Sequence, residues 1–305
     1  MDIYLAEPRG FCAGVRRAIS LVEQALEKYG APVYVRHEIV HNKHVIADLT
    51  AKGAVFVESL EEADVERPLV FSAHGVSRYV VEQARKQKFL TIDATCPLVE
   101  KVHRQIRLFQ QRNMEIIVIG KKNHPEIIGT LGQIDCQQKV HVINSLEEAK
   151  CLSIPLDAEV GFVTQTTLSI DDTQEIVAYL QKRFTHLNGL AKADICYATT
   201  NRQVAVKALL KSTPYILILG SQNSSNSRHL KDLALQNGAL GAWLVDDISE
   251  IDWKAIDNLE SLGISAGASA PEYLVADLLE ELRRRYRNIN EKRIIIAQEK
   301  VQFKL

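Results

Sequence analysis

Three cysteines, Cys12, Cys96 and Cys196, recur at related places in successive segments of the sequence. Cys96 and Cys196 each precede a run with helical periodicity, and 24 residues after each stands a glycine that ends an apolar run, Gly120 and Gly220. Thiolates are ligands for iron–sulfur clusters and for zinc, and a helix N-terminus favours the thiolate. Structural zinc usually has four ligands, often in pairs close in sequence. The pattern therefore favours a 4Fe–4S cluster with one iron open to substrate, and zinc stays an alternative.

The other two cysteines, Cys136 and Cys151, fall outside this repeat, so we expect them not to be metal ligands. Five cysteines are an odd and modest number, whereas a disulfide framework would be denser and even-numbered. The sequence also lacks a CxxC or CxxH pair, which argues against ribbon-type zinc sites and thioredoxin-like redox motifs.

Polar loops recur in the same three segments. They are rich in imidazole, hydroxyl and amide groups and poor in Lys and Arg, and the residues concerned are His41, His74, His124, Ser224, Ser225, Asn226 and Ser269. A single histidine in such a loop usually fixes the loop by a hydrogen bond, but three at related positions favour a shared anion. Together with helix N-termini, these groups can hold a phosphate or diphosphate without a basic patch.

A carboxyl group follows one of these histidines, in the sequence His124-Pro125-Glu126. Glu126 could serve as a general acid toward a ligand on the cluster, or it could be an ordinary acidic residue in the first turn of a helix that begins with proline. Thr166 and Thr167 could orient or relay that proton. Alternatively, they could cap the helix that follows, for which Ser169 is a further candidate.

Alternating strand and helix patterns are expected to position these loops. Short, nearly continuous apolar runs predict parallel strands buried on both faces, at residues 32–35, 69–71, 116–119, 140–143, 161–163, 215–219 and 242–245. Helical spacing appears within residues 98–109, 204–210 and 274–282. The alternation predicts an α/β fold with mainly parallel sheets, in which loops at the carboxyl ends of strands line the ligand site.

The internal repeat predicts three α/β lobes around a pseudo-threefold axis, which would bring the three sets of loops to one centre. We expect these lobes at residues 1–95, 96–195 and 196–285, followed by a C-terminal tail at residues 286–305. Cys12, His41 and His74 fall in the first lobe. The second lobe contains Cys96 and the carboxyl candidate, and the third contains Cys196.

The composition excludes several other classes of protein. The 305 residues are 46% hydrophobic and carry a formal net charge of −1. The chain therefore lacks the excess of positive charge on which non-specific nucleic-acid binding depends. No apolar stretch approaches the ~20 residues of a membrane span. The N-terminal residues lack the pattern of a signal or transit peptide. These features predict a cytoplasmic protein without a nucleic-acid or membrane partner.

At these motifs the sequence resembles the 4-hydroxy-3-methylbut-2-enyl diphosphate reductases, LytB-type iron–sulfur enzymes that end the methylerythritol phosphate route to isoprenoids. The resemblance runs in family order through nine stretches, residues 8–15, 35–42, 71–77, 93–99, 124–126, 164–169, 196–202, 223–227 and 266–271. It implies a three-lobed trefoil around a central 4Fe–4S cluster, or a 3Fe–4S form after loss of the open iron. It also implies reduction of the allylic alcohol diphosphate, by two electrons and two protons, to isopentenyl and dimethylallyl diphosphate.

By the same resemblance, Cys12, Cys96 and Cys196 hold the cluster and Glu126 is the proton source. His124 and Thr166 belong to the catalytic set with Glu126, and the diphosphate is held by the histidines, serines and asparagine of the polar loops. The hydroxyl end of the substrate lies near Thr166 and Thr167. The implied electron donor is a ferredoxin or a flavodoxin. A non-redox iron–sulfur hydro-lyase acting on a small phosphorylated substrate, and an iron–sulfur sensor without enzymatic activity, are the alternatives.

Overall fold

The computed structural model describes residues 1–135, 139–189 and 194–305, and the chain divides into two compact units. The first unit comprises Met1–Arg16, Val40–Asp48 and Tyr197–Gln302. The second comprises Arg17–Ile39, Leu49–Cys196 and Phe303–Leu305. Within the described residues, the first unit contains one five-stranded sheet and the second contains two four-stranded sheets.

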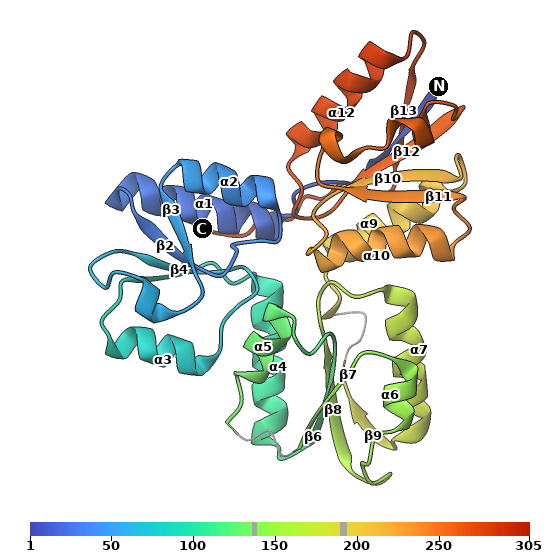
Figure 1. Cartoon of the computed structure of the whole chain (residues 1–305). Coiled ribbons are helices and arrows are strands. Elements are labelled where there is room, and N and C mark those ends of the chain that lie inside the picture. Colours follow the sequence, from blue (N-terminus) through green and yellow to red (C-terminus); the bar gives the residue numbers. More distant parts are fainter. Residues whose placement is uncertain (136–138, 190–193) are drawn as a thin grey trace. The chain divides into compact units, whose positions relative to one another are not determined.

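The sheet of the first unit has the strand order β11-β10-β12-β1-β13, and all its described pairings are parallel. Its strands are β1 (Asp2–Glu7), β10 (Tyr215–Leu219), β11 (Gly241–Val245), β12 (Ser261–Ala266) and β13 (Asn290–Ile295). Figure 1 shows α12 (Glu272–Arg285) on one face and both α9 (Tyr197–Leu209) and α10 (Ser225–Gln236) on the other. Two short helices, η2 (Ile248–Glu250) and α11 (Trp253–Ile256), follow β11.

One sheet of the second unit has the strand order β3-β2-β4-β5, again with parallel pairings. Its strands are β2 (Val33–Arg36), β3 (Ala54–Val57), β4 (Leu69–Phe71) and β5 (Thr91–Asp93). Here α3 (Arg78–Lys86) packs on one face together with η1 (Leu60–Glu62). Residues 17–29 of α1 (Ala13–Tyr29) lie on the opposite face (Figure 1), and α2 (Lys43–Ala51) precedes β3.

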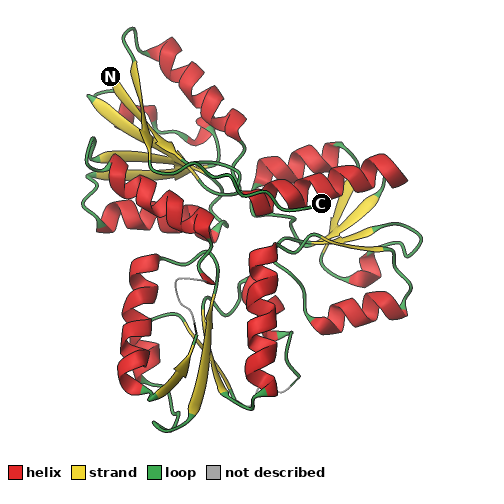
Figure 2. Ribbon diagram, turned by 180° about the vertical axis from the view of Figure 1, so that it is seen from behind, coloured by secondary structure: helices red, strands yellow, loops and turns green. Residues whose placement is uncertain are grey.

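The other sheet of the second unit has the parallel strand order β7-β6-β8-β9. Its strands are β6 (Glu115–Ile119), β7 (Val140–Ile143), β8 (Glu159–Thr164) and β9 (His186–Asn188). One face packs against α4 (Pro97–Gln111) and α5 (Pro125–Leu131), the other against α6 (Leu146–Lys150) and α7 (Ile170–Arg183), so the strands lie between two helical layers (Figure 2). Because both faces are covered, the central strands β6 and β8 are apolar except at their ends.

Local signals in the sequence explain where several helices begin. Proline occupies the first position of α4 and α5, where its missing N–H costs nothing. Serine side chains cap the N-termini of α7 and α10 through Ser169 and Ser224. Ser169, and not Thr166 or Thr167, therefore caps the helix after β8.

The predicted fold class is confirmed: the protein is α/β, and the described strands form three parallel sheets of four or five strands. All seven predicted strands are present, as are the three predicted helices. The lobe boundaries remain a prediction. They did not anticipate that β1 pairs with β12 and β13, nor that β13 lies within the predicted tail. Five of the six residues of β13 are exposed, as suits an edge strand, and its first four residues are polar.

Among the residues that the structure describes, the longest apolar helix falls short of what is needed to cross a membrane.

Candidate active site

The first unit gathers predicted site residues at the carboxyl ends of β1, β10 and β12. Cys12 follows β1 and directly precedes α1, and its backbone N–H donates to the Ala268 carbonyl at 3.2 Å. The Val15 backbone N–H points at the Cys12 Sγ, 3.5 Å away. This contact places the Cys12 sulfur at the N-terminus of α1.

A cluster of hydroxyl groups follows β10 and β12. The Ser269 Oγ donates to the His41 carbonyl at 2.9 Å and lies 3.5 Å from the Ser224 Oγ. The Ser224 Oγ in turn accepts the Ser227 backbone N–H at the start of α10. This unit therefore brings together three residues that are far apart in sequence, His41, Ser224 and Ser269.

Asn226, in the first turn of α10, is 4% exposed, and both polar atoms of its side chain lack a hydrogen-bond partner among the described residues. Ser225 beside it is 2% exposed. Buried amides are nearly always satisfied, so an orphaned one calls for an explanation. A ligand with acceptor oxygens at the N-terminus of α10 would supply the missing partner and also match the positive end of the helix dipole.

The second unit places Glu126 against Thr166. Glu126 lies in the first turn of α5 and is 2% exposed. Its Oε1 accepts the Thr166 backbone N–H at 2.6 Å, and its Oε2 accepts the Thr166 Oγ1 hydroxyl at 2.9 Å. Burial raises the pKa of Glu126 to about 7, although both hydrogen bonds from Thr166 oppose the rise because they favour the carboxylate. Such a group exchanges a proton near neutral pH.

Two predicted histidines meet in the same unit. The rings of His74, after β4, and His124, before α5, have centroids 5.8 Å apart and cross at 83°. The Nδ1 of His124 accepts the Glu126 backbone N–H at 3.1 Å, so His124 caps α5. Because Nδ1 is an acceptor there, the neutral ring carries its proton on Nε2 and can donate it to an anion.

The remaining predicted residues of this unit lie close to the same groups. The Cys96 backbone N–H donates to the Ala73 carbonyl, next to His74, and the Cys196 backbone N–H donates to the Thr166 carbonyl. Cys96 is the N-cap of α4, and Cys196 directly precedes α9. Thr167 accepts a hydrogen bond from the Gln165 side chain at 3.0 Å, so it fixes the loop after β8.

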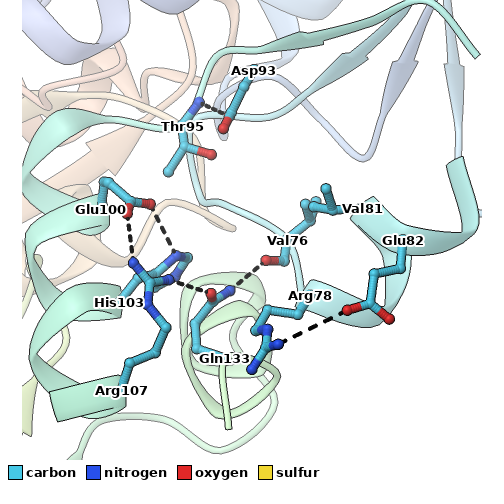
Figure 3. Close-up of a pocket in the computed structure, with 10 residues that line it drawn as sticks. All are labelled: Val76, Arg78, Val81, Glu82, Asp93, Thr95, Glu100, His103, Arg107 and Gln133. Carbon is cyan, nitrogen blue, oxygen red and sulfur yellow. Dashed lines mark hydrogen bonds and ion pairs between the residues drawn. The ribbon is translucent and has the colours of Figure 1, made fainter. Parts of the chain in front are cut away.

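A cavity of about 270 Å³ lies beside these loops, between α3, α4 and α5 (Figure 3). A chain of hydrogen bonds crosses it. Arg107 of α4 donates to Gln133 at 2.7 Å, and the Gln133 amide donates to the Val76 carbonyl at 2.7 Å. Arg107 also binds Glu100 at 2.9 Å. The network ties the segment after His74 to α4 and to the end of α5.

Two glycines near His74 leave no room for a side chain. Gly75 has φ +78°, and a Cβ there would lie 2.6 Å from the Cε1 of buried His103. A Cβ at Gly129 of α5 would lie 3.0 Å from the Gly75 carbonyl oxygen. These close approaches were not predicted from the sequence. A glycine inside the helical stretch of residues 125–131 was the available signal, because it often marks a close backbone approach.

We therefore expect Gly75→Ala to destabilise the protein more than Gly30→Ala. Both glycines have positive φ, +78° and +71°, but a Cβ at Gly30 would meet no atom within 4 Å. Gly30→Ala should cost only the left-handed strain of about 1–2 kcal/mol, and Gly75→Ala should add about 1–3 kcal/mol of overpacking. Urea unfolding of both variants measures the difference in their free energies of unfolding. Equal decreases in this free energy would show that the His103 side chain moves to accommodate the added methyl group.

Comparison with known proteins places this arrangement in a family. A family model described as LytB protein matches residues 3–283, a range that includes every predicted site residue. A 4-hydroxy-3-methylbut-2-enyl diphosphate reductase of Ruegeria pomeroyi is 48% identical over 305 residues, which are 100% of this chain and 96% of that protein. The chain belongs to the LytB family.

Solved structures agree with the LytB assignment. The E-1-hydroxy-2-methyl-but-2-enyl-4-diphosphate reductase from Plasmodium falciparum is 36% identical and superposes with a TM-score of 0.95, covering 99% of this chain and 95% of its own. A second structure is that of (E)-4-hydroxy-3-methyl-but-2-enyl diphosphate reductase, described as the terminal enzyme of the non-mevalonate pathway. It is 30% identical with a TM-score of 0.66, covering 93% of this chain and 99% of its own.

Proposed function

We propose that this protein is a 4-hydroxy-3-methylbut-2-enyl diphosphate reductase, the terminal enzyme of the non-mevalonate route to isoprenoids. It takes up two electrons and two protons and releases water together with isopentenyl or dimethylallyl diphosphate. Relatives of this activity match the chain over its whole length. The observation that carries the chemistry is the buried carboxyl group of Glu126, whose pKa of about 7 suits a proton donor at neutral pH.

The proposed cluster ligands are Cys12, Cys96 and Cys196. Each directly precedes a helix, each is partly buried, and none of the three forms a disulfide bond with another described cysteine. Three thiolates at helix N-termini are a donor set that fits an iron–sulfur cluster better than Mg²⁺ or Ca²⁺. When bound, a 4Fe–4S cluster with three cysteine ligands supplies electrons and one open Lewis-acidic iron.

The proposed diphosphate ligands are the polar groups at the strand ends of both units. In the first unit, His41, Ser224, Ser225, Asn226 and Ser269 offer imidazole, hydroxyl and amide donors beside the N-terminus of α10. In the second unit, the neighbouring imidazoles of His74 and His124 are the proposed donors. These neutral donors orient the substrate, and orientation of this kind can lower a barrier by several kcal/mol.

Glu126 is the proposed proton donor to the departing hydroxyl group, since a hydroxyl leaves far more readily as water. The proton is held on the carboxyl group that accepts hydrogen bonds from the Thr166 N–H and Oγ1. After donation, the same two hydrogen bonds stabilise the carboxylate. Thr166 and Thr167 would orient the hydroxyl end of the substrate near this group.

The first test is anaerobic purification followed by Mössbauer spectroscopy, with and without 4-hydroxy-3-methylbut-2-enyl diphosphate. We expect one iron site whose signal changes when substrate is added, and a 3Fe–4S signal after exposure to air. A parallel assay compares turnover with dithionite, with reduced ferredoxin or flavodoxin, the proposed physiological donors, and with no reductant. Turnover without a reductant would indicate a hydro-lyase. Zinc in place of iron, or a signal indifferent to substrate, would overturn the proposal.

Asn226→Ala should weaken substrate binding without weakening the fold. The side chain makes no described hydrogen bond, so its removal breaks none within the protein, whereas a lost hydrogen bond to a charged ligand costs about 1.5–3 kcal/mol. We expect KM to rise about 10- to 150-fold and Tm to stay or increase. Gln236→Ala, in the exposed last turn of the same helix, is the control and should change neither. An unchanged KM for Asn226→Ala would remove this residue from the diphosphate site.

A further inference from the structure

A fully buried arginine lies beside the first cysteine segment. Arg202 of α9 is 0% exposed. Its Nε and Nη2 donate to the Gly10 carbonyl at 3.1 and 2.6 Å, and its Nη1 donates to the Ala198 carbonyl at 2.9 Å. All of these residues belong to the first unit. The guanidinium therefore links the start of α9 to the loop that leads from β1 to Cys12.

The charge of this arginine is balanced by Glu299, from the segment that follows β13. The Glu299 Oε1 lies 3.0 Å from Nη1 and its Oε2 lies 3.3 Å from Nη2, so the carboxylate faces the guanidinium with both oxygens. Glu299 also accepts the Asn201 amide at 3.1 Å, and its side chain is only 14% exposed. Because a buried charge without a partner is strongly unfavourable, Arg202 depends on Glu299 to remain buried.

The Gly10 carbonyl is the point at which this pair acts on the cysteine segment. Gly10 has φ +65°, and its N–H donates to the Ala266 carbonyl at the end of β12. Two residues later, the Cys12 N–H donates to the Ala268 carbonyl. The segment is therefore held on one side by the β12 loop and on the other by Arg202. Without the Arg202 contact, one of these two attachments is lost.

We propose that Glu299 is a positioning residue that acts through Arg202 to fix the segment of Gly10 and Cys12, and so slows the loss of metal from Cys12. The proposal rests on the proposed function in one respect, the assignment of Cys12 as a cluster ligand. Glu299 lies outside the range matched by the LytB family model, which ends at residue 283. Through the contacts of Glu299 with Arg202, the segment after β13 contributes to the position of Cys12.

The test compares Glu299→Gln with Glu291→Gln in the full-length, anaerobically purified protein. Glu291, on β13, forms an exposed pair with Arg283, so its replacement is the matched control. We expect Glu299→Gln to release iron to a chelator about tenfold faster than wild type, because the buried guanidinium loses its counter-charge. Glu291→Gln should release iron at the wild-type rate. Glu299→Asp keeps the charge and should largely restore retention.

A second readout separates positioning from a general loss of stability. After removal of the iron, the alkylation rates of Cys12 and Cys96 are measured by mass spectrometry in the same molecule. Cys96 belongs to the other compact unit, so Glu299→Gln should speed the labelling of Cys12 alone. Equal acceleration at both cysteines, or wild-type behaviour at both, would overturn the proposal. A wild-type protein that binds no iron would instead overturn the proposed function, and the Cys12 labelling would still test the contact.

Discussion

Glu126→Gln is expected to lose most turnover while retaining iron and bound substrate. Glutamine preserves the shape of the side chain and one acceptor for Thr166, but it has no acidic proton. General acid catalysis contributes about 10²–10⁴-fold to a rate, so kcat should fall by about that factor. Iron analysis and substrate affinity, measured beside kcat, show whether the loss is confined to proton transfer.

The pH dependence gives an independent check on Glu126. Because the protonated form is the donor and its pKa is about 7, wild-type activity should fall as the pH rises above about 7. Thr166→Val removes the Oγ1 hydrogen bond that favours the carboxylate, so it should raise this pKa and move the fall to higher pH. The small residual activity of Glu126→Gln should show no step near pH 7.

A matched control for Glu126 is Glu147, which is also acidic and in a first helical turn, but exposed. Glu147→Gln should leave kcat and its pH profile at wild-type values. Near-wild-type turnover in Glu126→Gln would remove Glu126 from the mechanism and leave its raised pKa as a consequence of burial alone.

Cys96→Ser is the second substitution with a large expected effect. Serine offers a harder oxygen ligand that remains protonated at neutral pH, so it is a poor substitute for a thiolate on iron. We expect iron content and turnover to fall to background, whereas the fold, measured by circular dichroism, persists because Cys96 also caps α4 through its backbone.

Cys151→Ser is the control for this experiment. Cys151 is exposed at the C-terminus of α6, so its replacement should leave iron content and turnover unchanged. Cys136→Ser should behave in the same way, although Cys136 lies outside the described residues. Iron loss in either variant, or full iron content in Cys96→Ser, would contradict the assignment of the cysteines.

Much of the fold could be predicted from local patterns. Apolar runs such as residues 116–119 and 215–219 are strands in the structure, and Pro97 and Pro125 begin helices. These features depend only on residues that are neighbours in the sequence, so they can be predicted from the sequence. The strand β3, although apolar throughout, and the edge strand β13, five of whose six residues are exposed, were not predicted. A run as short as that of β3 does not by itself distinguish a strand from other structure.

The candidate site could be predicted only in part from the sequence. The sequence by itself determined which residues follow each strand, because parallel strands place those residues at one edge of a sheet. It therefore indicated Glu126 and Thr166 as candidates, 40 residues apart. Only the tertiary structure decided that they bond to each other, since this contact follows from the adjacency of β6 and β8 in their sheet.

The energetics of the site likewise depend on the tertiary structure. The raised pKa of Glu126 is caused by burial, the requirement for glycine at position 75 by the neighbouring side chain of His103, and the burial of Arg202 by its partner Glu299. None of these follows from residue type or spacing. Solvent exclusion and charge pairing are properties of the whole packed unit. A sequence pattern, in contrast, reflects only interactions between residues that are close in the sequence.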